Sequence, residues 1–160
     1  MKTSLRKALT AMVASVVFGF GAPALADCPT QFAPLREQVP LKVITHHGKR
    51  VFLIEVARTA DEQERGLMCR SHLDANKGMI FPMDPPRPAA FWMKNTMIPL
   101  DIVFITPEGR IESIRRNARP YDLTPLASGG SVKAVLELGG GVAHKLGIKE
   151  GDKIVWPVAR

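Results

Sequence analysis

The hydrophobic pattern of this chain consists of short apolar runs separated by glycine, proline and polar residues. Two of these runs, 41–45 and 51–57, are separated by a turn segment that contains Gly48 and Lys49, which predicts a β-hairpin. A third run, 132–138, alternates along its length, as a strand with one face in a core does. The chain is therefore expected to be rich in short strands. Further strands are predicted at 78–81, 89–93, 100–105, 111–115 and 153–156.

Two short helices are expected to interrupt this series of strands. Thr59 followed by Glu62 three residues later has the form of a capping box, which predicts a helix over about 60–68. Gly66 is able to help end that helix, and a second helical turn is predicted at 142–146. The predicted fold class is therefore mainly β, of the β-rich α+β type: a small barrel or a rolled, mostly antiparallel sheet with two short helices.

Proline indicates where the strands and the folded unit should begin and end. Pro82 and the proline-rich segment 84–88 are predicted to end the third strand at Phe81, because proline donates no backbone hydrogen bond. Residues 117–130 contain two prolines and two glycines and are predicted to be a long loop. Three prolines within 27–40 indicate an irregular lead-in, which leaves residues 41–160 as a single β-rich domain.

The N-terminal segment has the three parts of an export signal. Three basic residues within the first seven positions precede an uncharged apolar stretch, 8–20, and residues 24–26 read Ala-Leu-Ala, as a signal peptidase site requires. We predict that residues 1–26 are a cleaved signal peptide and that the mature chain, starting at Asp27, is exported to the periplasm. An uncleaved N-terminal anchor and a lipoprotein are the alternatives.

The charge of the chain changes once this segment is removed. The 160 residues carry a formal net charge of +7, and cleavage before Asp27 removes three basic residues and no acid, which leaves +4. This mild positive charge suits an anionic ligand or envelope surface and is too weak to indicate binding to nucleic acid. We therefore expect no nucleic-acid partner, and no stable membrane anchor after cleavage.

The two cysteines, Cys28 and Cys69, both remain in the predicted mature chain. Export would bring them into an oxidising compartment, where a disulfide between them would tie the N-terminal segment to the domain. The alternative is two unpaired thiols, in which case Cys69 could bind a soft metal ion.

Several segments resemble a known family. Residues 65–70 read Arg-Gly-Leu-Met-Cys-Arg, 78–81 read Gly-Met-Ile-Phe, and 91–101 read Phe-Trp-Met-Lys-Asn-Thr-Met-Ile-Pro-Leu-Asp. Together with 136–138 and 147–152, they make nearly the whole mature chain similar to the bacterial and archaeal family catalogued as domain of unknown function 192. The resemblance implies a compact β-rich domain that is often exported. It implies no established activity.

One segment departs from the family's usual pattern. Residues 139–141 are three glycines, where the family commonly has proline and alanine after its Leu-Glu-Leu strand. The glycines are expected to loosen this connection. A glycine-rich segment before a helix could also bind an anion on its backbone N–H groups, although a flexible turn is the simpler interpretation.

The candidate binding site combines charged and polar residues of two of these segments. Lys94 and Asn95 follow an apolar strand and Asp101 begins the next, so the loop between them is expected to bring the three together. In one interpretation they form a cleft for a small anionic or hydroxylated ligand. In the other they form an internal polar cluster, in which Asp101 accepts backbone hydrogen bonds and an arginine neutralises it. The predicted ligand-binding residues are Arg65, Arg70, Trp92, Lys94, Asn95 and Asp101.

The function predicted first is that of an exported binding or accessory protein without a cofactor. One alternative is an envelope enzyme that uses Lys94 and Asp101 in acid–base chemistry. A second is a periplasmic copper carrier, because thioethers and thiolates bind Cu(I), although methionine also fills gaps in hydrophobic cores. The residues that would bind copper are Met68, Cys69, Met93 and Met97.

Overall fold

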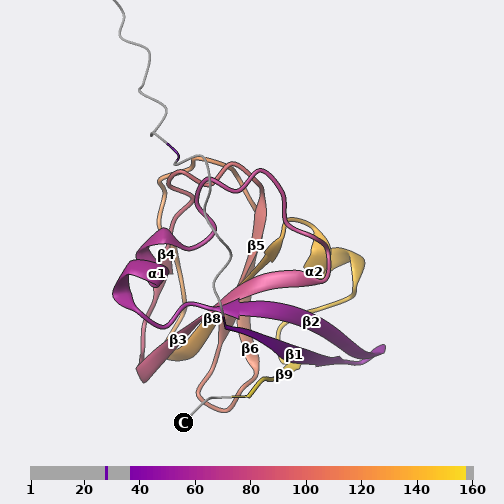
Figure 1. Cartoon of the computed structure of the whole chain (residues 1–160). Helices are drawn as coiled ribbons and strands as arrows, with labels where there is room; N and C mark the ends of the chain where they lie inside the picture. Colours follow the sequence, from indigo (N-terminus) through magenta and orange to yellow (C-terminus); the bar gives the residue numbers. More distant parts are fainter. Residues whose placement is uncertain (1–27, 29–36, 158–160) are drawn as a thin grey trace, which may run out of the picture.

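Seven strands form one sheet in the computed structural model, which describes Cys28 and residues 37–157 (Figure 1). The predicted signal peptide, 1–26, and most of the predicted lead-in, 27–40, lie outside the described residues. The helices are α1 (Ala60–Arg65) and α2 (Val142–Lys145). The strands are β1 (Gln38–Thr45), β2 (Gly48–Val56), β3 (Lys77–Arg87), β4 (Ala90–Phe91), β5 (Leu100–Ile105), β6 (Ile111–Ala118), β7 (Leu126–Ala127), β8 (Val132–Gly139) and β9 (Lys153–Val155).

The sheet is rolled, so that its two edge strands approach each other. Across the sheet the order is β6-β5-β8-β3-β2-β1-β9, and neighbours are antiparallel except for the parallel pair β2 and β3. Arg110, just before β6, forms an isolated bridge with Lys153 of β9, so the two edges of the sheet meet at one point. The predicted class, mainly β with two short helices, is confirmed. The sheet is rolled and is not a closed barrel.

The strongest local predictions are confirmed. β1 and β2 form the predicted hairpin, with Thr45 paired with Gly48 at its turn. At α1, the Thr59 hydroxyl accepts a hydrogen bond from the Glu62 backbone N–H, and the Glu62 carboxylate accepts one from the Thr59 N–H. The helix ends at Gly66, which has a φ of +48°, so it is shorter than predicted.

Several other predicted boundaries also differ from the structure. β1 begins at Gln38, so the end of the predicted lead-in is part of the sheet. β3 continues through Pro82 to Arg87, because Pro82 still pairs with Ala134 and a register shift beyond it accommodates the remaining prolines. The loop predicted at 117–130 contains β7, which pairs with β4 in a separate two-stranded sheet.

The centre of the sheet is buried on both faces, and this divides the core into two layers. Val103 of β5 packs into the first layer, and its neighbour Phe104 packs into the second, as side chains alternate along a strand. The first layer is covered by α2 through Ala143. The second contains Leu67, which follows α1, and Phe91 of β4 packs against it. α1 and β4 lie together on one side of the sheet (Figure 1).

Candidate functional site

A pocket of about 370 Å³ opens over the second core layer. The end of α1 forms one side of it, and the segment around β4 forms the other. Gly66 allows the end of α1 to lie close to Phe81, because a Cβ atom at residue 66 would be 3.3 Å from Cζ of Phe81. Its φ is also positive, a conformation that other residues adopt only with strain. Most of the lining is apolar. The lining residues are Gln63, Glu64, Arg65, Gly66, Leu67, Met68, Phe81, Met83, Ala90, Phe91, Trp92, Lys94, Thr96 and Glu137.

Glu137 of β8 contributes a buried carboxyl group to this pocket. Met79 of β3 pairs with Glu55 of β2 on one side and with Glu137 on the other, so the three side chains lie in one row on the same face of the sheet. Glu137 is only 5% exposed, and among the described residues no hydrogen bond or ion pair reaches its carboxyl group. Burial raises the pKa of Glu137 to about 8, although the charge of Arg70 opposes this rise. The group is therefore mostly a neutral acid at pH 7.

Arg70, a predicted ligand-binding residue, has a structural partner. Its guanidinium group donates hydrogen bonds to both carboxylate oxygens of Glu55, over 2.5 and 2.7 Å. Both side chains are largely buried, with 16% and 8% of their surfaces exposed. Such a two-point pair neutralises the buried Glu55, and Arg70 does not line the pocket.

Three of the six predicted site residues do line the pocket: Arg65, Trp92 and Lys94. Trp92 is 51% exposed, and the ammonium group of Lys94 lies 5.5 Å from the centre of its ring. This is a favourable distance for a cation–π contact. Arg65 stands at the end of α1, on the other side of the pocket. Both sides of the pocket therefore contribute a positive charge.

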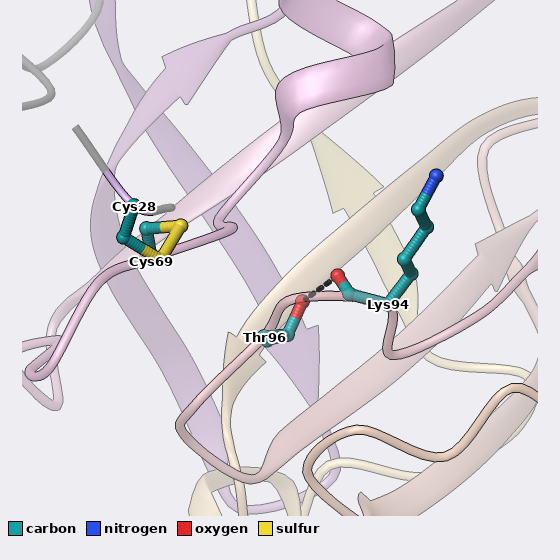
Figure 2. Close-up of a disulfide and its surroundings, with 4 residues drawn as sticks. All are labelled: Cys28, Cys69, Lys94 and Thr96. Atoms are coloured by element: carbon teal, nitrogen blue, oxygen red, sulfur yellow. Dashed lines mark hydrogen bonds between the residues drawn. A yellow bond between two sulfur atoms is a disulfide. The ribbon is translucent and has the colours of Figure 1, made fainter. Parts of the chain in front are cut away.

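A tight turn positions Lys94 in the pocket wall. The Thr96 backbone N–H donates to the Met93 carbonyl over 3.1 Å, and the Thr96 hydroxyl donates to the Lys94 carbonyl over 3.1 Å. Figure 2 shows the Lys94 side chain extending away from this turn and from the disulfide. Asn95 does not line the pocket. It has a φ of +53°, and its carbonyl accepts a hydrogen bond from the Cys69 N–H.

Asp101 was expected near Lys94, and this prediction is wrong. The residue is fully buried on the opposite face of the sheet, away from the pocket lining. Its carboxylate accepts hydrogen bonds from the backbone N–H groups of Asn117 (2.7 Å), Gly141 (3.1 Å) and Ala143 (2.8 Å). Asp101 thus joins β5 to β6 and α2, which matches the backbone part of the internal-cluster interpretation. It is not placed for acid–base chemistry with Lys94.

The glycine segment 139–141 is closely packed at Gly140, contrary to the expectation of a loose connection. A Cβ atom on Gly140 would lie 2.6 Å from the side-chain oxygen of Asn117 and 2.8 Å from Cβ of Pro99. The Gly140 N–H donates to the Pro99 carbonyl over 2.8 Å. The anion that the backbone of this segment does bind is the protein's own Asp101, through the Gly141 N–H.

The structure contains the disulfide between Cys28 and Cys69, whose Cα atoms lie 5.5 Å apart (Figure 2). Because Cys69 is oxidised, it cannot supply the thiolate that the copper hypothesis required. Met93 is fully buried in the second core layer, where it fills space, while Met68 and Met97 are half-buried. Among the described residues, no group of three His, Cys, Asp or Glu side chains is arranged to hold a metal ion.

Comparison with known proteins identifies the family. The family model DUF192, described as "Uncharacterized ACR, COG1430", matches residues 42–156. This chain belongs to the DUF192 family. No curated protein sequence matches it.

Two solved structures are similar to this DUF192 chain. One is a protein of unknown function from Novosphingobium aromaticivorans DSM 12444, with 46% identity over 86% of this chain and all of that chain, and a TM-score of 0.75. The other, from Sinorhizobium meliloti 1021, is described as a "putative transcription regulator". It is 33% identical over 79% of this chain and 98% of that chain, with a TM-score of 0.74.

Sequence reasoning missed Glu137, a polar group in the lining of this DUF192 pocket. The alternation of β8 put Glu137 on one face with Lys133 and Val135, but it did not show that this face is buried at Glu137. A signal was present in the Leu-Glu-Leu segment, because one acid stands between two leucines in a strand that the structure buries along most of its length. In the described part of the chain, no helix is long and apolar enough to span a membrane.

Proposed function

We propose that this DUF192 protein is an exported binding protein whose pocket takes a small molecule with an apolar body and an oxygen-bearing polar group. The observation that carries the proposal is Glu137: a carboxyl group in a pocket, without a hydrogen-bond partner among the described residues. A buried polar group without a partner costs free energy, and a ligand that supplies the partner recovers it.

The chemistry of the pocket defines the class of ligand. As a neutral acid, Glu137 has an O–H group that can donate to a carbonyl, hydroxyl or carboxylate oxygen. Lys94 and Arg65 outnumber Glu64, the other acid of the lining besides Glu137, which favours an anionic group on the ligand. The apolar walls, including Leu67 and Phe91, suit an aliphatic or aromatic body. A small organic carboxylate or hydroxylated compound meets all three conditions.

The described helices give no support to extending the Sinorhizobium protein's description to this chain. Many regulators place a recognition helix in the major groove of DNA. The helices described here have six and four residues. Nor does the mild charge expected of the mature chain favour nucleic acid.

Export to the periplasm is part of the proposal and rests on residues 1–26. N-terminal sequencing of protein recovered from the periplasm should give a chain that starts at Asp27. A chain that retains Met1 would reject cleavage.

The binding function can be tested by native mass spectrometry of protein purified from the periplasm of the bacterium that produces it. We expect the wild type to carry a bound small molecule that is lost in Glu137→Leu, which has no hydrogen-bonding group, and in Trp92→Ala. Glu150→Leu, at an exposed acid outside the pocket, is the matched control and should retain the molecule. A wild-type protein with the mass of the bare chain, or equal retention in all variants, would contradict the proposal.

A further inference from the structure

The exposed face of β1, β2 and β9 alternates lysine with aliphatic side chains. In one cross-strand row, Lys42 of β1 lies between Val51 and Val155. In the next row the pattern is reversed, and Ile44 lies between lysines 49 and 153. The sheet face defined by these residues and Leu53, here called the lysine face, is therefore both cationic and apolar.

The aliphatic residues of the lysine face are unusually open to solvent. Val51 is 52% exposed, Ile44 45%, and Leu53 and Val155 are each 41% exposed. These residues lie on the half of the sheet that α1 and β4 do not cover. Half-exposed aliphatic side chains interleaved with lysines suit contact with a surface that is apolar and anionic together.

No negative charge interrupts this surface within the hairpin. Residues 38–54 contain three lysine or arginine residues and two histidines, but no aspartate or glutamate. The first acid that follows, Glu55, is buried in its pair with Arg70. The hairpin is therefore complementary in charge to an anionic surface.

We infer that the lysine face binds the surface of an anionic phospholipid bilayer. Aliphatic side chains enter the boundary between headgroups and acyl chains, and lysines keep their ammonium groups at the phosphates. Binding strength then depends on apolar area and on attraction to anionic lipid together. The inference is independent of the Glu137 pocket, because no residue of the lysine face lines that pocket.

Vesicle sedimentation of the purified exported protein tests this inference. One set of vesicles contains equal amounts of phosphatidylglycerol and phosphatidylcholine, and the other contains phosphatidylcholine alone. We expect binding to the first set only, and a decrease in binding as salt is added. Each lysine near an anionic surface contributes roughly fivefold, so the triple substitution of Lys42, Lys49 and Lys153 by Gln should weaken binding roughly a hundredfold.

Two further variants separate the contributions of charge position and apolar contact. A control triple, in which the exposed residues Arg87, Arg115 and Arg119 become Gln, changes the net charge equally and should retain most of the binding. Val51→Ser combined with Leu53→Ser keeps every charge and should also weaken binding. Equal loss in both charge triples would mean that net charge alone acts, and would overturn the inference.

Other outcomes point to other occupants and would also overturn the inference. Equal binding to both vesicle types would remove the role of anionic lipid. Self-association that Val51→Ser abolishes, without vesicle binding, would assign the face to a second copy of this chain.

Discussion

Glu55 and Glu137 lie in one row across the sheet, separated only by Met79, yet their environments differ completely. Glu55 is held by a two-point ion pair with Arg70. Glu137 opens into the pocket, and no ion pair or hydrogen bond to its carboxyl group is found among the described residues. Arg70 thus neutralises one of the two buried acids in this row, and the carboxyl group of the other is open to the pocket.

Stability should depend on pH through Glu137. Its pKa rises from 4.5 to about 8 on folding, so between these values the native protein holds a proton that the unfolded chain has released. The free energy of unfolding should therefore fall as pH rises through this range, by up to about 1.4 kcal/mol per pH unit. Glu137→Gln lacks this dependence.

Thermal melts between pH 4.5 and 8 provide the measurement for this effect. The melting temperature of Glu137→Gln should increasingly exceed that of the wild type as pH rises. Glu150→Gln should follow the wild-type curve. If Glu137→Gln and the wild type depend on pH in parallel, Glu137 is not a buried neutral acid.

Substitution of Lys94 by Met should reduce ligand retention with little effect on stability. The side chain is exposed and its contact is the Trp92 ring, so its removal should cost less than about 1 kcal/mol. Lys133→Met is a matched control, since its ammonium group lies 5.3 Å from the Trp156 ring, outside the pocket. Native mass spectra and thermal melts of both variants separate the two effects. A large loss of stability in Lys94→Met alone would make this lysine structural.

Substitution of Gly140 by Ala should destabilise the protein. The added Cβ would come within 3.0 Å of the Pro99 backbone as well as the Asn117 side chain, and such overpacking costs roughly 1–3 kcal/mol. Gly130→Ala is the control, because nothing lies within 4 Å of its Cβ position. Chemical denaturation of the two variants should show a lower midpoint for Gly140→Ala only. Equal midpoints would mean that the segment 139–141 is loose after all.

The disulfide should be present in the exported protein. Intact mass after alkylation, in denaturant but without reductant, should show no modified cysteine, and reduction should expose two thiols. Replacing Cys28 and Cys69 by serine should cost roughly 2–5 kcal/mol of stability. Two thiols that react without reductant would reject the bridge.

Local signals allowed much of the fold to be predicted from the sequence. The hairpin of β1 and β2 depends on a turn between two neighbouring strands, and α1 depends on Thr59 and Glu62, three residues apart. Both are set by residues close in sequence. The continuation of β3 through Pro82 was not predictable in this way, because its partner, Ala134, lies far along the chain.

The site was only partly predictable, for the same reason. Trp92 and Lys94 were found because they lie in one distinctive segment. The surroundings of Arg70, Asp101 and Glu137 could not be predicted, because they depend on strand register and on partners in other strands. A lone acid in an apolar strand indicates burial, but only the register places it beside the pocket.

The titration of the Glu137 carboxyl group tests the central claim most directly. Carbon-detected NMR of protein with labelled glutamate, assigned with Glu137→Gln, follows this carboxyl group across the pH range. The account predicts a pKa of about 8 in the ligand-free protein, because the group is buried and has no hydrogen-bond partner in the described part of the chain. A pKa near 4.5, the ordinary value for glutamate, would contradict the account.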